Sequence, residues 1–402
     1  MSLLRVEDAI ATILGRVPAP SGEAVPLAQA DGRILFEPLI ASHSQPPFAA
    51  SAMDGYAVRA DDVAVGKKFV ITGISQAGAG FSGIVGSGQC VRIFTGAPVP
   101  SGADAVIMQE EASATDGEVV FSTQPSAHRN IRPVGNDFAA GQRLMEAGER
   151  LTPYSVALAA AANRDHIVAS RRPRLAVLAT GDELRLPGAP LGPDTIVASN
   201  SFGLVPMFRP YAAEVRDFGV APDEPTALRA RLSAAFDSGI DVLITTGGAS
   251  VGDHDIVQDV LKSIGVDLDF WRINMRPGKP LMFGTRGNTL VFGLPGNPVS
   301  AMVTAAMFIK PALRQWLGMS RPIPVPMRLP LAAPTPLNSS RRHFMRARLA
   351  TTIDGTAVEP ISQTDSGHTS SLALADLLII QPENDPGQGA GSIVDCVWLN
   401  EF

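Results

Sequence analysis

The spacing of apolar residues divides the chain into regions of different secondary structure. From Val6 through Ile13 the apolar positions recur at helical spacing, so we expect a short helix near the start. Residues 46–135 instead contain strand-length apolar runs, such as 68–74 and 90–94, and Gly-rich clusters that break helices lie between them. This region is therefore expected to form a β-rich domain.

Between residues 174 and 318 the pattern changes to short, fully apolar strands that alternate with helical stretches. The strand sequences are RLAVLAT, DVLITTGG and TLVFGL, and the helical ones include TALRARLSAAF and NPVSAMVTAAMFI. Strands that are apolar on both faces belong to a sheet that helices cover on both sides, which predicts a parallel, doubly wound α/β domain. Ligands of such domains bind at the carboxyl ends of the strands.

Two further elements flank this α/β region. Thr152 and Pro153 have the residue types of a helix cap and a first helical residue, and the Ala-rich sequence SVALAAAAN follows them. At the other end, the Pro-rich sequence RPIPVPMRLPLAAPTP precedes strand runs such as LLII and IVDCVWL. The last region is therefore expected to be a small β domain.

Composition restricts the class of protein. A chain of 402 residues exceeds one hydrophobic core, so several domains are expected. The net charge of −6 and the lack of a basic block argue against a nucleic-acid partner. Cys90 and Cys396 lie far apart and outside zinc-ligand spacing, which favours a reducing, cytoplasmic location. The longest apolar stretch, 156–162, is far shorter than the ~20 residues of a membrane helix, so no membrane association is expected.

Seven short motifs, rich in Gly, Pro and charged residues, carry the candidate chemistry. In chain order they are PPFAASAMDGYAVR at 46–59, TGAPVP at 95–100, GND at 135–137, ATGDEL at 179–184, GGASVGDHD at 247–255, RPGKP at 276–280 and GLPGNPVS at 293–300. An ordinary turn or a solvated loop explains each motif taken alone. Their occurrence together in this order is the informative observation.

The physical chemistry of two motifs indicates an anionic ligand. Consecutive glycines after a buried strand allow backbone N–H groups to approach an anion, although a tight strand-to-helix turn has the same sequence. Arg276 and Lys279 are separated by a Pro-Gly turn, which is expected to aim both side chains into one pocket. The alternative for these two cations is a solvated basic loop.

The ordered motifs resemble those of the molybdopterin molybdenumtransferase family, which includes the enzymatic E domain of gephyrin, over about residues 1–400. This resemblance implies a multidomain α/β plus β fold. The expected parts are an elongated, discontinuous linker and dimerisation domain at 1–45 and 138–172, a β-rich domain at 46–137, a central doubly wound molybdopterin-binding α/β domain at 173–322 and a C-terminal small β-barrel at 323–402.

The resemblance also implies a transferase of molybdenum cofactor biosynthesis. Such an enzyme inserts molybdenum from molybdate into adenylylated molybdopterin and releases AMP. Mg²⁺ is the expected cofactor, because hard carboxylate oxygens suit this ion and it bridges phosphate oxygens. The expected working unit is a homodimer with a cleft between subunits, and a molybdopterin adenylyltransferase is a candidate partner.

Site residues follow from the same resemblance. The expected catalytic residues are Asp54, Thr95, Asp137, Glu183 and Lys279. The expected metal ligands are Asp54, Asp137, Glu183 and Asp255. The residues expected to contact the pterin nucleotide or molybdate are Arg132, Gly181, Asp182, Asp223, Gly247, Gly248, Ser250, Asp255, Arg276, Pro295, Gly296, Asn297 and Ser366. His254 and His368 lie inside motifs and receive no role, because a lone His is more often a structural hydrogen-bonding group.

The sequence departs from the family pattern at a few positions. Arg276 stands where members often have Lys, and Asn136 stands where they usually have Glu. Thr364-Asp365 precede Ser366 where Gln-Gly is common. Pro206 falls in a stretch that resembles an unbroken family helix, so a kink or an early helix end is predicted there.

Two other functions remain open from the sequence. The α/β domain also resembles the molybdopterin adenylyltransferase module, so adenylylation is an alternative, although SAMDGYA and TGAPVP lie outside that module. A gephyrin-like scaffold or binding protein is an alternative of another class. The retained acidic residues disfavour a purely structural role, because clustered carboxylates are costly to keep.

Overall fold

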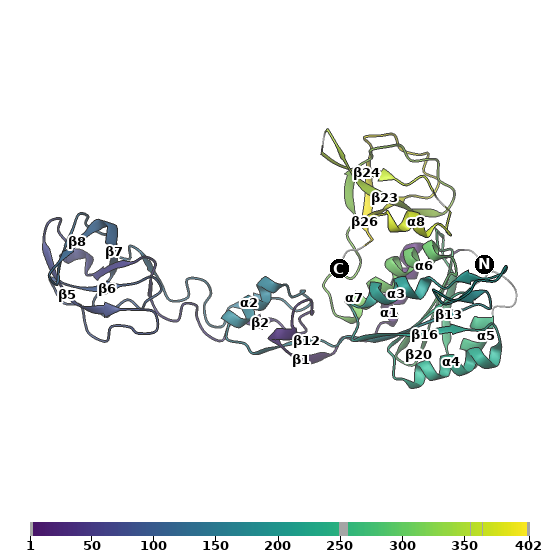
Figure 1. Cartoon of the computed structure of the whole chain (residues 1–402), viewed down its shortest axis with the longest axis horizontal. Helices are drawn as coiled ribbons and strands as arrows, with labels where there is room; N and C mark the ends of the chain where they lie inside the picture. Colours follow the sequence, from purple (N-terminus) through teal and green to yellow (C-terminus); the bar gives the residue numbers. More distant parts are fainter. Residues whose placement is uncertain (1–2, 249–255, 354, 364, 400–402) are drawn as a thin grey trace.

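The computed structural model describes residues 3–248, 256–353, 355–363 and 365–399. The chain is elongated, with a small β module at one end and a larger group of helices and sheets at the other (Figure 1). A thin middle segment joins the two. None of the helices in these described ranges combines the length and apolar character that a membrane crossing requires.

The module at the far end is a six-stranded sheet in the order β7-β4-β6-β5-β9-β8. Its strands are β4 (Gly55–Val58), β5 (Lys68–Ser75), β6 (Gln89–Ile93), β7 (Ala105–Met108), β8 (Ala112–Thr115) and β9 (Glu118–Phe121). Neighbours pair antiparallel except β5 with β6, which are parallel. Phe69 and Phe121 fill its core. The prediction of a β-rich region at 46–135 is confirmed.

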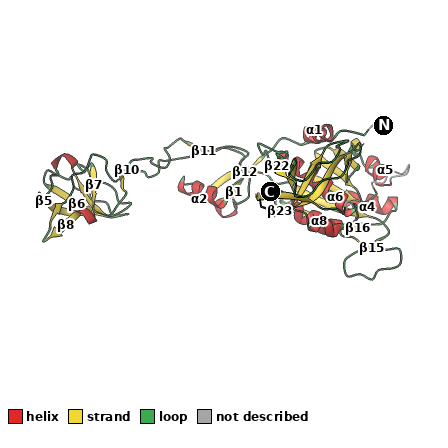
Figure 2. Cartoon of the chain, turned by 90° about the horizontal axis from the view of Figure 1, so that it is seen from above, coloured by secondary structure: helices red, strands yellow, loops and turns green. Residues whose placement is uncertain are grey.

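The middle segment is built from two passes of the chain that run in opposite directions (Figure 2). Its elements are β1 (Gly22–Pro26) paired with β12 (His166–Ser170), β2 (Leu39–Ile40) paired with β11 (Arg143–Met145), β3 (Ala50–Ser51) paired with β10 (Ile131–Arg132), and α2 (Pro153–Ala161). Thr152 caps α2 as predicted, because its hydroxyl accepts from the Ser155 N–H and the Ser155 hydroxyl reaches back to the Thr152 N–H.

The central domain contains a six-stranded sheet in the order β16-β13-β17-β21-β20-β18. The strands are β13 (Arg174–Thr180), β16 (Glu214–Ala221), β17 (Val242–Thr246), β18 (Asp267–Arg272), β20 (Pro280–Arg286) and β21 (Thr289–Leu294). The prediction of a wholly parallel sheet is wrong at one edge, because β20 and β18 are antiparallel to their neighbours. Gly287 and Asn288 form the two-residue turn that joins β20 to β21, a sequence typical of hairpins.

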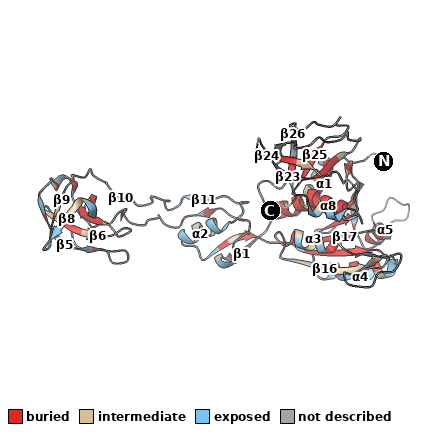
Figure 3. Cartoon of the chain, turned by 45° about the horizontal axis from the view of Figure 1, so that its top comes forward, coloured by how far each residue is buried: buried red, intermediate tan, exposed pale blue. Residues whose placement is uncertain are grey.

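Helices cover both faces of this sheet, as predicted. On one face lie α1 (Val6–Arg16), α3 (Asn200–Phe208), α6 (Pro298–Thr304) and α7 (Lys310–Trp316), and on the other lie α4 (Pro225–Asp237) and α5 (Ile256–Ser263). Alternate residues of β13 point to opposite faces of the sheet. Leu175 and Val177 pack in the hydrophobic core on the α1 side, and Ala176 and Leu178 pack in the core on the α4 side. The strands are therefore buried between helices (Figure 3).

Helix α3 ends early, as its prolines predict. It includes Pro206, stops at Phe208 and is followed by Pro210, which cannot donate a helical hydrogen bond.

The last part of the chain forms a second mixed sheet. Its strands are β22 (Met327–Pro330), β23 (Arg342–Thr352), β24 (Gly355–Pro360), β25 (Leu377–Gln381) and β26 (Ile393–Trp398), accompanied by the short helix α8 (Thr369–Ala373). The order is β19-β23-β25-β26-β22 with β24 beside β23, and Leu331 bridges to Val358 of β24. Strand β19 (Met275–Arg276) comes from the central domain, so this pairing ties the two domains together.

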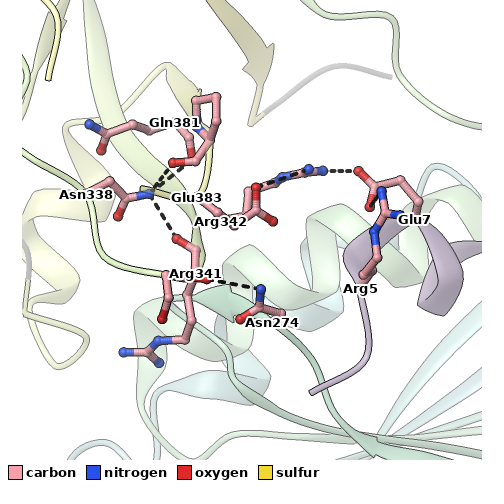
Figure 4. Close-up of polar contacts among 10 residues, drawn as sticks. Arg5, Glu7, Asn274, Asn338, Arg341, Arg342, Gln381 and Glu383 are labelled. Atoms are coloured by element: carbon pink, nitrogen blue, oxygen red, sulfur yellow. Dashed lines mark hydrogen bonds and ion pairs between the residues drawn. The ribbon is translucent and has the colours of Figure 1, made fainter. Parts of the chain in front are cut away.

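Polar side chains reinforce this junction (Figure 4). Arg342 forms ion pairs with Glu7 of α1 and, at 3.5 Å, with Glu383. The Asn274 amide donates to the Ser340 carbonyl at 3.2 Å, next to the start of β23. These contacts fix the beginning of β23 on the central domain.

Both cysteines are free, as expected from the sequence, and both are buried. Burial raises the pKa of the Cys90 and Cys396 thiols to about 12. Neither thiol is therefore a reactive group at neutral pH.

The close contact between β4 and β7 leads to a first prediction. A Cβ on Gly55 would lie 1.9 Å from the Ile107 carbonyl oxygen of β7, so no side chain fits there. Gly55→Ala is expected to lower the stability of this module by about 2–3 kcal/mol, measured as faster amide hydrogen exchange in β4, β6 and β7. Gly15→Ala is the matched control, since Gly15 lies in α1 with no heavy atom within 4 Å of the added Cβ. Equal exchange in the Gly55→Ala and wild-type proteins would contradict this account.

Candidate functional site

A cleft of about 540 Å³ lies at the carboxyl ends of β13, β17 and β21. It is the place where an α/β sheet is expected to bind its ligand. Its lining brings together these residues selected from the sequence: Gly181, Glu183, Asp223, Gly247, Gly248, Lys279, Pro295, Gly296 and Asn297. Five separate segments of the chain therefore meet in one cleft, as expected for the central domain.

Closely packed glycine backbone lines part of this cleft. Gly247 follows β17 with φ +88°, and a Cβ there would lie 2.3 Å from the Thr180 carbonyl oxygen of β13. Its N–H donates to the Leu294 carbonyl of β21 at 3.3 Å. The ends of three strands are so close that only glycine fits, which leaves main-chain groups facing the ligand.

Carboxylates gather on one side of the cleft. Glu183 and Asp223 line it, and the Asp182 carboxylate accepts a hydrogen bond from the Asp223 N–H at 3.1 Å. Partial burial, followed by the negative charges of Asp182 and Glu183, raises the pKa of Asp223. A cationic group bound here would offset this repulsion.

Lys279 supplies positive charge on the opposite side. Among the described residues that line the cleft, Lys279 is the cation. It immediately precedes β20, and because β20 runs antiparallel to β21, its start lies at the edge where β21 ends. The antiparallel edge that sequence reasoning missed is thus what brings Lys279 to the cleft.

Arg276 does not share this position. The prediction that Arg276 and Lys279 point into one pocket is wrong for the described cleft, because Arg276 is absent from its lining. Strand β19 pairs with β23, and the Arg276 Nη2 lies 3.1 Å from Nδ1 of His343, the residue opposite. The pairing with the C-terminal sheet therefore turns this side chain away.

Sequence reasoning also missed Asn200. Its amide donates to the Gly296 carbonyl at 2.8 Å, and its Oδ1 is buried without a partner among the described residues. It follows the short pair β14 (Leu184–Arg185) and β15 (Ile196–Val197), which closes this side of the cleft. A Ser-Asn-Ser sequence before a helix is typical of helix caps. The sequence therefore offered no reason to place Asn200 in the cleft.

A loop of the C-terminal domain reaches the cleft through Ser366. The Asn297 amide donates to the Ser366 Oγ at 2.9 Å, and the Val299 N–H donates to the Ser366 carbonyl at 3.1 Å. Buried Arg346, which sequence reasoning missed, holds this loop by donating at 2.6 Å to both the Gln363 carbonyl and the Ser371 Oγ. HFMRARL contains two arginines and a histidine, so no signal in this sequence singles out Arg346.

Asp54 and Thr95 form a separate pair on the N-terminal module. The Asp54 Oδ1 accepts from the Thr95 N–H at 2.7 Å and from its hydroxyl at 2.8 Å. These two hydrogen bonds, the backbone one first, lower the pKa of Asp54, and nearby Arg92 contributes in the same direction. The carboxylate is therefore held ionised by its own module.

Arg132 and Asp137 lie on segments that border this pair. Arg132 is exposed on β10 opposite Ala50 of β3, and the exposed Asp137 donates its N–H to the Gln45 carbonyl at 2.9 Å. Ala50 also bridges to Pro98 of the TGAPVP motif. The N-terminal motifs thus come together at one end of their module.

Within one chain, the two groups of predicted residues do not meet. The module with Asp54 and Asp137 lies at the opposite end of the elongated chain from the domain with Glu183 (Figure 1). Across the described residues no three His, Cys, Asp or Glu side chains are grouped as a metal site. The expected magnesium ligands Asp54, Asp137 and Glu183 therefore do not fit a single ion within one chain. Ser250, His254 and the fourth expected ligand, Asp255, lie outside the described residues.

Family models match most of the chain. Residues 4–163 match the MoeA N-terminal region (domain I and II), and residues 176–315 match a probable molybdopterin binding domain. Residues 328–399 match the MoeA C-terminal region (domain IV). The fold and its cleft therefore define a multidomain MoeA-type protein with a central domain of the molybdopterin-binding class.

Individual relatives agree. The molybdopterin molybdenumtransferase of Haemophilus influenzae is 38% identical over 79% of this chain and 79% of its own length. Molybdopterin molybdenumtransferase 2 of Mycobacterium tuberculosis is 36% identical over 93% of this chain and 94% of its own. The crystal structure of the molybdopterin biosynthesis MoeA protein from Pyrococcus horikosii superposes with a TM-score of 0.86 at 29% identity, covering 100% of both chains. The chain belongs to the molybdopterin molybdenumtransferase family.

The Asp54–Thr95 pair generates a prediction about ionisation. Thr95→Val removes the hydroxyl donor and keeps the backbone donor, so the pKa of Asp54 is expected to rise toward its ordinary value without reaching it. Carboxyl ¹³C chemical shifts followed against pH measure this change. Thr95→Ser, which keeps the hydroxyl, should titrate like the wild type, and an equal pKa in all three proteins would refute the assignment.

Proposed function

We propose that this protein inserts molybdenum from molybdate into adenylylated molybdopterin and releases AMP. The observation that carries the proposal is the cleft at the strand ends, which brings together glycines, carboxylates and Lys279 in a chain that belongs to this family throughout. Cleavage of the pyrophosphate bond frees the nucleotide and leaves molybdenum on the pterin dithiolene.

The cleft residues divide into two roles. The main chain around Gly181, Gly247 and Gly248 faces the phosphate groups of the pterin nucleotide, because glycine has no side chain and lets an anion approach the backbone closely. Lys279 provides the positive charge that an oxyanion or phosphate requires. Asn297 and Ser366, which are hydrogen-bonded to each other, present an amide and a hydroxyl from two domains at its rim.

The complete site in this proposal belongs to a homodimer. The N-terminal module with Asp54 and Thr95 is remote from the cleft of its own chain, so a second copy has to supply it (Figure 1). Twofold symmetry then produces two identical composite sites. In such a site, Asp54 and Asp137 of one chain would hold Mg²⁺ together with Glu183 of the other, and the ion would offset negative charge on the phosphates.

The same proposal assigns the parts of the chain. Residues 1–45 and 138–172 form the linker and dimerisation domain, 46–137 the β-rich domain, 173–322 the molybdopterin-binding domain and 323–402 a small β-barrel. The bridge between Leu331 and Val358 supports the barrel, because it links the two outer strands of the last sheet. We place the enzyme in the cytoplasm, with a molybdopterin adenylyltransferase as the supplier of its substrate. The matches outside the central domain favour molybdenum insertion over adenylylation.

Lys279 provides the direct test of this function. With adenylylated molybdopterin and molybdate supplied, Lys279→Ala is expected to release AMP about a hundredfold more slowly, because it removes a charged donor from the developing anion. Lys262→Ala is the control, since Lys262 is exposed on α5 and does not line the cleft. The proposal is wrong if the wild-type protein releases no AMP, or if it consumes ATP without molybdate.

Composite sites make a separate prediction about mixtures. Asp54→Ala and Lys279→Ala proteins are each expected to release AMP at about a hundredth of the wild-type rate or less, yet an equal mixture that has exchanged subunits should recover about a quarter of wild-type AMP release. Half of the dimers are then mixed, and each carries one intact site of two. Inactivity of the mixture after exchange, verified with two differently labelled subunits, would show that the sites are not shared.

A further inference from the structure

The linker joins the central domain through two short connections. Residues 17–21 lead out from α1 to β1, and residues 171–173 lead back from β12 to β13. The two connections lie side by side, because Gly22 of β1 pairs with Ser170 of β12. The direction in which the whole linker leaves the central domain is therefore decided at this junction.

We propose that Arg171 is a positioning residue that fixes the direction of the linker, and with it the place at which the N-terminal module meets the cleft of a second chain. This inference rests on the proposed function, since the proposed homodimer is what brings Asp54 of one chain to Glu183 of the other. Arg171 lies outside the described lining of the cleft and acts only through the linker.

The Arg171 guanidinium is clamped to the central domain. Its Nη2 donates to the Asp241 Oδ1 at 2.8 Å, and its Nη1 donates to the Asp241 Oδ2 at 3.0 Å. Two parallel hydrogen bonds to one carboxylate fix the orientation of a planar guanidinium as well as its distance. Its Cζ also lies 5.5 Å from the centre of the Trp316 ring at the end of α7, a cation–π contact. Because the Arg171 N–H donates to the Ser21 carbonyl at 2.8 Å, one residue holds both connections to the central domain.

The sheet itself holds the carboxylate that receives this clamp. Asp241 immediately precedes β17, its N–H donates to the Arg174 carbonyl at 2.8 Å, and its carbonyl accepts from the Leu290 N–H at 3.0 Å. The Asp241 Oδ2 accepts from the Arg174 N–H at 2.8 Å as well. Asp241 is thus fixed between the starts of β13 and β21. The clamp lies at the amino end of these strands, whereas the cleft lies at their carboxyl ends.

Other contacts hold the base of the linker without setting this side chain. Ser170 is only 1% exposed, and its Oγ donates to the Leu317 carbonyl at 2.7 Å. A Cβ on Gly148 would lie 2.6 Å from the Gly318 carbonyl oxygen, so the linker packs directly on the loop after α7. These contacts remain when the Arg171 clamp is removed. Loss of the clamp is therefore expected to loosen the angle of the linker rather than to detach it.

The length of the linker amplifies any change of angle at its base. The N-terminal module lies at the opposite end of the chain from the central domain, so a small rotation at the junction moves Asp54 by a much larger distance (Figures 1 and 2). Misplacing a reacting group by about 1 Å can slow a reaction about a hundredfold. A composite site at the end of such a linker consequently needs a fixed angle at its base.

Distance measurements test the geometric part of the inference. Arg171→Gln removes the charge and the bidentate geometry, whereas Arg171→Lys keeps the charge and one hydrogen bond. Spin labels on Tyr154→Cys in α2 and Arg231→Cys in α4, both exposed positions, report the distance between the linker and the central domain when labelled chains are diluted with unlabelled ones. The distance distribution in Arg171→Gln is expected to be about twice as wide as in the unsubstituted background, with Arg171→Lys in between.

AMP-release kinetics separate positioning from substrate binding. Arg171→Gln is expected to lower kcat about tenfold and to leave the KM for adenylylated molybdopterin within about twofold, because the cleft is intact and only the module of the other chain is displaced. Arg171→Lys should keep kcat within about threefold of wild type. Arg348→Gln is the matched control, since it breaks an exposed ion pair with Glu359, 2.7 Å long, in the C-terminal sheet. It should change neither the distance distribution nor kcat.

The outcomes distinguish this inference from the proposed function. An unchanged distance distribution in Arg171→Gln overturns the role of Arg171, and so does a wider distribution with an unchanged kcat. A wild-type protein without AMP release overturns the function, while the distance measurement still decides whether Arg171 fixes the linker. If Arg171→Gln does not fold, Asp241→Asn takes its place, because it removes one of the two acceptors, and the same two results decide.

Discussion

The close approach of three strand ends is the constraint on which the cleft depends. Gly247 stands so near the Thr180 carbonyl that a Cβ is excluded, and its left-handed backbone is one that other residues rarely adopt. The backbone of Gly247 therefore lines the cleft without a side chain, beside the charged side chains of Glu183, Asp223 and Lys279.

The linker imposes a second constraint, because it separates the N-terminal motifs from the cleft of the central domain. The sequence motifs of both parts are expected to belong to one site. The two antiparallel passes that join β1 to β12 and β2 to β11 make the molecule long rather than compact. The pKa of Asp54 is lowered within its own module, because Thr95 donates both hydrogen bonds to its carboxylate. In the homodimer that we propose, this module would complete the site of another copy of the chain.

Sequence patterns predicted those features that depend on local chemistry. The apolar runs of β13, β17 and β21, the Thr152 cap and the early end of α3 all follow from the residue types present. The antiparallel edge was missed because apolar runs carry no information on strand direction, although Gly287 and Asn288 hold the hairpin signal. The orientation of Arg276 was missed for another reason. It is set by pairing with β23, a strand that begins far along the chain and belongs to another domain.

Charge balance supports the proposal that a phosphorylated ligand needs more than one chain to complete its site. Partial burial, followed by the charges of Asp182 and Glu183, raises the pKa of Asp223, whereas Lys279 is the cation among the described residues that line the cleft. A pyrophosphate that enters this cleft adds negative charge beside carboxylates that already repel one another. Additional positive charge has to accompany the ligand. A metal ion held together with the carboxylates of a second chain, as in the homodimer that we propose, would supply it.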